Sequence, residues 1–243
     1  MFPMLIEAMT MTEFQERLRI SRTVLIPVGS VEEHGDHLPL GTDTIHAFEV
    51  CRLAGERTGA FVAPPVFYGV CRSTSQHPGT LTISGDTLRA LIKDIGSALY
   101  QQGLRNMIIL SGHAGGTHTA ALVEAGEALL ERLPEAQIAV LNILDLGAAV
   151  WEPIIETKGD AHAGELETSV MMALRPTWVK GSSPEEYPRF PKAILVRNKR
   201  KFWPGGVWGD PAKASLEKGT ALLEEATGAL VQLIKVLERG ESL

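Results

Sequence analysis

Carboxylate and imidazole side chains are concentrated in residues 32–43, directly after an apolar run. This segment, EEHGDHLPLGTD, contains Glu32, Glu33, His34, Asp36, His37 and Asp43. Carboxylate oxygens and neutral imidazole nitrogens are the ligands that Zn, Mn and Fe(II) accept in proteins. Glu32 and His34 are two residues apart, so both point to one side of an extended chain. Because one metal ion needs three or four ligands, the segment predicts part of a metal site that other segments must complete.

A second histidine segment follows another apolar run. Residues 106–110 (NMIIL) read as a strand buried on both faces and lead into SGHAGGTH at residues 111–118. In parallel sheets, ligands bind beyond the carboxyl ends of the strands. If this strand neighbours the strand at residues 23–28, His113 approaches Glu32, His34 and Asp43. Asp43 is the candidate bridge between two ions, because a carboxylate has two ligating oxygens.

The glycines of SGHAGGTH have two readings. We expect Gly115 and Gly116 to let the backbone come close to metal and substrate, with N–H groups toward a developing oxyanion. A phosphate cradle at a helix N-terminus is the other reading. That reading lacks the GKS or GKT ending and the GxGxxG spacing.

Two further segments supply candidates. In DAHAGELETS (residues 160–169), a helix starting near residue 163 would separate Glu165 and Glu167 by about 200°, so only one of them shares a site with His162. In STSQHPGT (residues 73–80), Ser75 and His77 are candidate substrate contacts, and His77 suits a polar loop equally well. Cys51 and Cys71 suit small core positions better than nucleophile positions.

Length and composition limit the class of protein. The 243 residues, 44% of them hydrophobic, predict a single domain over residues 1–243. A net charge of -6, with RNKRK at 197–201 as a short surface turn, argues against a nucleic-acid partner. No apolar run approaches the roughly 20 residues of a membrane helix, and the N-terminus does not resemble a signal peptide. Two cysteines without CxxC spacing indicate a reduced, cytoplasmic protein.

The predicted elements alternate between strands and helices. Strands are expected at residues 23–28, 60–65, 106–110 and 138–144, with a late one at 193–196. Helices are expected between them, one of them capped by Asp86 or Thr87. This alternation predicts an α/β fold with a mostly parallel sheet covered on both faces. Trp203 and Trp208 flank glycines and suit either a lid or a subunit contact.

Four segments in order resemble the creatininase family of metal-dependent amidohydrolases. They are VLIPVGSVEEHGDHLPLGTD, STSQHPGTLT, IILSGHAGG and DAHAGELETS, spanning residues 24–169. The family includes creatinine amidohydrolases, formamidopyrimidine deformylases and a peptide-processing enzyme of mycofactocin maturation. The resemblance implies a three-layer α/β/α sandwich, two divalent metal ions (Zn, Mn or Fe), a small-molecule amide substrate and a homo-oligomer, often a hexamer.

The resemblance also implies roles for individual residues. Glu32, His34, Asp43 and His113 match the family's metal ligands, with Asp43 as the bridge, and His162 matches its proton-transfer residue. Glu167 matches the acid that ends the family's HAGxxE pattern, and we assign it to the metal. We place Glu165 beside His162 in catalysis, and which of the two glutamates completes the site stays open.

One position departs from the family pattern. Creatininase has a ligand glutamate two residues after the histidine that matches His113, and here Gly115 stands there. Creatinine is therefore not the expected substrate, and Glu167 is the candidate replacement ligand. We expect hydrolysis of a non-peptide or cyclic amide by a metal-bound hydroxide, with His162 transferring the proton. The alternatives are a peptide-trimming metalloenzyme of the same family and a non-catalytic oligomeric metal- or ligand-binding protein.

Overall fold

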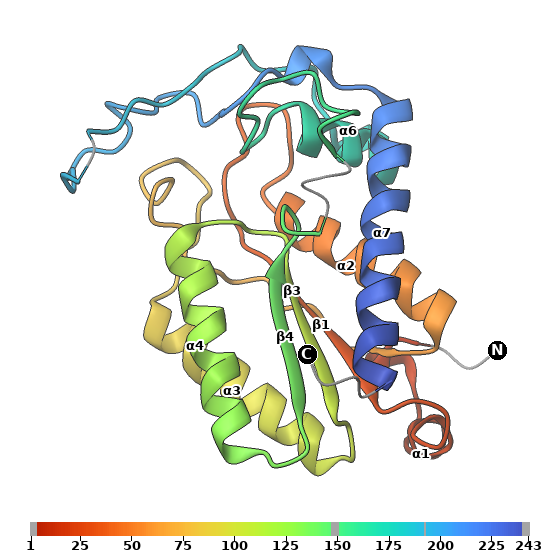
Figure 1. Ribbon diagram of the computed structural model, residues 1–243. Coiled ribbons are helices and arrows are strands. Elements are labelled where there is room, and N and C mark those ends of the chain that lie inside the picture. The colour runs from red at the N-terminus through yellow and green to blue at the C-terminus, as the bar shows by residue number, and fades with distance from the viewer. Residues whose placement is uncertain (1–3, 147–150, 192, 240–243) are drawn as a thin grey trace.

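The computed structural model describes residues 4–146, 151–191 and 193–239 (Figure 1). Within these ranges, four strands form one parallel sheet in the order β2-β1-β3-β4. They are β1 (Thr23–Val28), β2 (Phe61–Val62), β3 (Asn106–Ser111) and β4 (Gln137–Asn142). The predicted α/β class with a parallel sheet is thereby confirmed.

Helices cover both faces of the sheet, giving three layers (Figure 1). On one face lie α2 (Thr42–Thr58) and α7 (Leu216–Arg239), with α6 (Glu165–Leu174) packed on α7. On the other lie α3 (Gly85–Gln101) and α4 (Gly116–Arg132). Because side chains alternate along a strand, Leu25 packs into the first hydrophobic layer and Val24 into the second. The continuous apolar runs of β1 and β3 follow from burial on both faces.

The remaining elements frame the sheet. The short helix α1 (Met11–Arg17) is capped by Thr10, which forms a capping box with Glu13. Three 3-10 segments lie at Ile6–Ala8, Pro176–Trp178 and Pro211–Lys213. Between the last two, residues 184–191 and 193–202 extend from the body and are called the arm below (Figure 1). Across the described ranges, no helix has the length and apolar character needed to cross a membrane.

Several predicted boundaries differ from the structure. The strand expected at 60–65 is only two residues long, because Pro64 and Pro65 have no N–H to donate to a neighbour. The strand expected at 193–196 is not formed there, and its Leu195 is 86% exposed. The helix cap expected at Asp86 or Thr87 is Ser84, whose hydroxyl accepts from the Thr87 N–H. A helix or loop expected from residue 147 begins outside the described residues.

The two cysteines are both free and buried, which agrees with a protein without a disulfide. Cys51 lies in the hydrophobic layer under α2, as expected of a small core residue. Cys71 lies instead in the loop between β2 and α3, close to the candidate site described next.

Candidate metal centre

The site forms where the loops after β1 and β3 meet. These strands are direct neighbours, and Val28 stands beside Ser111 in the register. The N–H of Gly112 donates to the Val28 carbonyl at 2.8 Å. A Cβ on Gly112 would overlap the backbone carbonyl of Asp43, so glycine lets the first turn of α2 approach the β3 loop. The predicted convergence of the two loops is therefore confirmed.

Asp43 stands between two histidines. Its Oδ1 lies 3.0 Å from Nε2 of His34, and its Oδ2 lies 3.2 Å from Nδ1 of His113. The Ser30 hydroxyl donates to Oδ2 at 2.6 Å and holds the carboxylate in this orientation. The two oxygens of one buried carboxylate thus face two different imidazoles, which is the geometry expected of a bridging ligand.

Two glutamates extend this arrangement on opposite sides of Asp43. Oε2 of Glu32 lies 2.8 Å from Nδ1 of His113, while its Oε1 accepts from the Thr74 hydroxyl. Oε2 of Glu167, on the first turn of α6, lies 3.6 Å from Nε2 of His34. The described residues therefore form a first donor group of Glu32, Asp43 and His113 and a second donor group of His34, Asp43 and Glu167.

The histidine rings are oriented as metal ligands usually are. Nδ1–H of His34 donates to the Glu32 carbonyl at 3.1 Å, and Nε2–H of His113 donates to the Val70 carbonyl at 3.2 Å. Because a carbonyl can only accept, the other nitrogen of each ring faces the carboxylates, and this nitrogen offers its lone pair to a metal ion once it has lost its proton. Ligating histidines characteristically donate their other N–H to a carbonyl or carboxylate. The donor set and its orientation therefore fit divalent metal ions.

The pKa shifts in the cluster also favour a bound metal cation. Burial raises the pKa of Glu32, but the adjacent His113 outweighs it and brings that pKa down to about 2. Burial lowers the pKa of His34, but Asp43 and Glu167 together raise it to about 10. Without a metal ion, protonated imidazoles are thus the charges that balance these buried carboxylates. A buried anionic cluster of this kind suits a cation of higher charge.

His162 lies at the edge of the cluster. Its Nε2–H donates to the Glu33 carbonyl at 2.8 Å, and its ring centroid is 4.2 Å from that of His34. The next residue, Ala163, has a φ of 48°, and its N–H donates to Glu167. The left-handed turn therefore places His162 and Glu167 side by side at the start of α6.

Glu33 belongs to the acidic segment at residues 32–43, but no function was assigned to it from the sequence. Its side chain is 7% exposed, and Oε1 lies 3.7 Å from Nε2 of His162 and 3.9 Å from Nδ1 of His77. Among the described residues, this oxygen has no hydrogen-bond partner. Glu33 is identified by its burial and by its distance to His162, the predicted proton-transfer residue. Both depend on the tertiary structure and have no local sequence pattern.

A cavity of about 280 Å³ opens above the donor groups. Besides Glu32, Asp43, His113, His162 and Glu167, its wall includes Arg72, Ser73, Gly115, Gly116, Trp203 and Trp208. The two predicted glycines therefore line the cavity. Trp203 and Trp208 form one wall, with ring centroids 6.0 Å apart.

The structure does not bring the other two predicted substrate contacts to the cavity wall. Both ring nitrogens of His77 face carbonyls, of Thr74 at 3.2 Å and of Trp203 at 2.7 Å. The Ser75 hydroxyl donates to the Arg72 carbonyl at 3.1 Å. Because this loop is coiled into turns, its earlier residues Arg72 and Ser73 reach the cavity instead.

Glu165, which we placed in catalysis, also lies away from the histidines. Its fully buried carboxylate accepts from the N–H groups of Glu156 and Thr157 and pairs with Lys218 at 2.6 Å. Each residue turns a helix by about 100°, so Glu165 and Glu167 point to nearly opposite sides of α6. Glu167, rather than Glu165, joins the cluster.

An α/β/α fold with buried carboxylates and histidines at the carboxyl ends of parallel strands defines an α/β protein with a candidate metal centre. The chain belongs to the creatininase family of amidohydrolases, since the family model described as creatinine amidohydrolase matches residues 7–234. The chain is 31% identical to a mycofactocin precursor peptide peptidase of Mycolicibacterium smegmatis, over 87% of this chain and 84% of that one. It is 27% identical to a creatinine amidohydrolase of Pseudomonas putida, over 93% and 94% of the two chains.

Solved structures agree with this family. A crystal structure of creatinine amidohydrolase superposes with a TM-score of 0.87 at 26% identity, covering 96% of each chain. Two further creatininase structures, at the same identity and covering 96% of this chain, are described as a Zn-Zn type and as a Mn form, with TM-scores of 0.86 and 0.85. Divalent metals are therefore supported for this fold.

Proposed function

We propose that this protein is a two-metal amidohydrolase that cleaves a non-peptide or cyclic amide. The observation that carries the proposal is Asp43, whose two oxygens face His34 and His113. One ion would be held by Glu32, Asp43 and His113, and the other by His34, Asp43 and Glu167. Zn, Mn or Fe suits these nitrogen and oxygen donors. When bound, the ions would polarise the amide carbonyl and lower the pKa of a water molecule.

The proton-transfer role falls to His162. The hydrogen bond from its Nε2–H to the Glu33 carbonyl keeps a hydrogen on Nε2 and leaves Nδ1 of the neutral ring as the acceptor. In the proposed reaction, Nδ1 takes the proton and returns it to the leaving nitrogen. Such acid–base groups contribute about 10²–10⁴-fold in rate. Glu33 beside Nε2 stabilises the charged ring when it forms.

The cavity wall limits the substrate. Trp203 and Trp208 offer aromatic faces, Arg72 and Ser73 offer donors, and Gly115 and Gly116 contribute no side chain. A flat amide or ring can pack against the indoles while its carbonyl faces the donor groups. The absence of a side chain at Gly115 favours a group bulkier than creatinine. The proposed substrate is therefore a cyclic amide or formamide larger than creatinine.

Peptide trimming is the second candidate function. It is favoured by the 31% identity to the mycofactocin precursor peptide peptidase. The donor groups serve both reactions equally, because each breaks a carbon–nitrogen bond at a carbonyl. What separates them is how far the substrate extends beyond the cavity.

We also propose a homo-oligomer, a hexamer as in the family. The arm extends from the body (Figure 1) and carries Ile194 and Leu195, which are 66% and 86% exposed. Apolar side chains of this exposure on a projecting segment suit a contact with another subunit.

An amide panel tests the proposal. Protein loaded with Zn or Mn is assayed with creatinine, larger cyclic amides, formamides and a short peptide, and Glu124→Gln on the exposed face of α4 serves as the control. We expect turnover of a non-peptide amide. Cleavage of the peptide alone would replace this proposal by the second candidate. Two bound ions without hydrolysis of any compound would favour a binding protein.

A further inference from the structure

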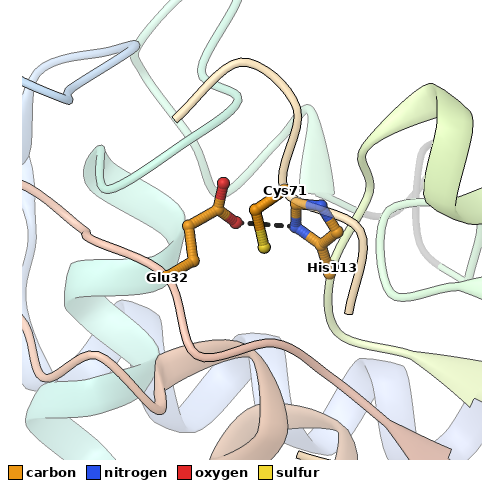
Figure 2. Close-up of side chains that lie close together, drawn as sticks. All are labelled: Glu32, Cys71 and His113. Atoms are coloured by element: carbon orange, nitrogen blue, oxygen red, sulfur yellow. Dashed lines mark ion pairs between the residues drawn. The ribbon is translucent and has the colours of Figure 1, made fainter. Parts of the chain in front are cut away.

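Cys71 stands against the first donor group. Its sulfur, a carboxylate oxygen of Glu32 and a ring nitrogen of His113 all lie within 4.8 Å of one another. Figure 2 shows the Cys71 side chain beside the Glu32–His113 ion pair. All three residues are buried, and Cys71 is 0% exposed. The thiol therefore belongs to this cluster and not to the hydrophobic layers.

Backbone hydrogen bonds of Val70 and Cys71 hold the segment that carries the thiol in this position. The Val70 carbonyl accepts from Nε2–H of His113 at 3.2 Å, and the Val70 N–H donates to Nδ1 of His118 at 3.1 Å. The Cys71 N–H donates to the Thr82 hydroxyl at 2.9 Å. The same backbone that orients the His113 ring therefore also carries the sulfur to it.

With the sulfur, the first donor group has the number and types of donors that Zn prefers. Glu32, His113 and Cys71 offer one oxygen, one nitrogen and one sulfur, and Asp43, whose Oδ2 lies 3.2 Å from Nδ1 of His113, would supply the fourth donor. Four donors of nitrogen, oxygen and sulfur type match the tetrahedral preference of Zn. Gly115, which lines the same cavity, has no donor side chain. The second donor group, with His34 and Glu167, has nitrogen and oxygen donors only.

We propose that Cys71 is a metal ligand of the first donor group and makes this position selective for Zn over Mn. This inference rests on the proposed two-metal function. Coordination replaces the S–H bond by a sulfur–metal bond and releases the proton to solvent. A thiolate favours Zn, whereas carboxylate and water ligands suit Mn. The two positions then differ in chemistry, although they share Asp43.

X-ray absorption of the zinc-loaded protein tests this proposal. Zn–S scattering lies at about 2.3 Å and Zn–N or Zn–O scattering at about 2.0–2.2 Å. We expect a Zn–S shell in the wild type and in Cys51→Ala, where the other cysteine of the chain is removed from the core. The shell should be absent from Cys71→Ser and Cys71→Ala.

Competition between metals gives a second readout that does not involve activity. Mn should displace Zn from the wild type poorly, and in Cys71→Ser the Zn preference should fall by about tenfold or more, the scale expected for loss of a metal-site interaction. Bound Zn without a Zn–S shell in the wild type would overturn the role of Cys71 and leave the two-metal function standing. A wild type that binds no Zn would overturn both. If the Cys71 variants do not fold, the presence or absence of a Zn–S shell in the wild type and in Cys51→Ala still shows whether Cys71 is a ligand.

Discussion

Oδ2 of Asp43, on the first turn of α2, lies 3.2 Å from Nδ1 of His113, in the loop after β3. The contact exists because β1 and β3 are neighbours and Gly112 allows α2 to come close. With Oδ1 turned toward His34, the same carboxylate joins both donor groups. This relationship makes Asp43 the residue that the two donor groups share.

Asp43→Ala should therefore lose more metal than Glu32→Ala. A bridging carboxylate contributes to both ions, whereas Glu32 contributes to one. Elemental analysis after dialysis should show about two ions per chain in the wild type, about one in Glu32→Ala and fewer in Asp43→Ala. Circular dichroism checks that both variants are folded. Equal metal loss in the two variants would argue against the bridge.

His162→Ala should keep its metal and lose rate. In the proposed reaction the ring of His162 transfers the proton, and removal of such a group costs about 10²–10⁴-fold in rate. Metal content and turnover are measured on the same preparation. If the variant loses an ion, His162 is a ligand of the second donor group, with which it clusters, and the proton-transfer role would need another residue.

Gly115→Ala and Gly116→Ala form a matched pair. A Cβ at Gly115 would collide with Nε2 of His113, whereas a Cβ at Gly116 meets nothing within 4 Å. We expect Gly115→Ala to displace the ring and weaken Zn binding at the first donor group by about 10–100-fold, the scale reported for disturbed ligand orientation. Gly116→Ala should bind Zn as the wild type does. Equal affinities in a competition titration would show that the His113 ring adapts.

Metal binding should release protons at neutral pH. In the metal-free protein, burial lowers the pKa of His34, but Asp43 and Glu167 raise it to about 10, so the ring is protonated at neutral pH. A metal ion can bind only the deprotonated nitrogen. Zn affinity should therefore rise with pH, by about tenfold per unit for each proton released. Calorimetry in buffers of different ionisation enthalpy measures this number, and a value of zero would contradict the charged-imidazole description.

The arm should carry a subunit contact. Leu195→Asp places a charge where an apolar side chain is 86% exposed. If the arm packs against another subunit, this change weakens the oligomer, and light scattering should report a smaller mass than for the wild type at equal concentration. Unchanged circular dichroism and metal content would show that the protomer is intact. An unaltered mass would place the contact elsewhere.

The sequence alone determined the fold class and the loops that carry the candidate ligands. Continuous apolar runs such as residues 106–110 require burial on both faces, and alternation with helices makes the strands parallel. Parallel neighbours end at the same edge, so Glu32, His34, Asp43 and His113 were predicted to meet if their two strands are neighbours, and the pairing of β1 with β3 met that condition. The pattern of apolar residues and the alternation of strands with helices are both visible in the sequence, so they can be predicted without the tertiary structure.

The tertiary structure alone decided which neighbouring side chains reach the site. Glu167 rather than Glu165 faces His34 because the start of α6 is set by the left-handed turn at Ala163. Cys71 stands beside His113 because the Val70 carbonyl holds the ring of a residue from another segment. The direction of a side chain in a loop depends on hydrogen bonds to residues distant in the chain, and the sequence carries no local pattern from which these can be read.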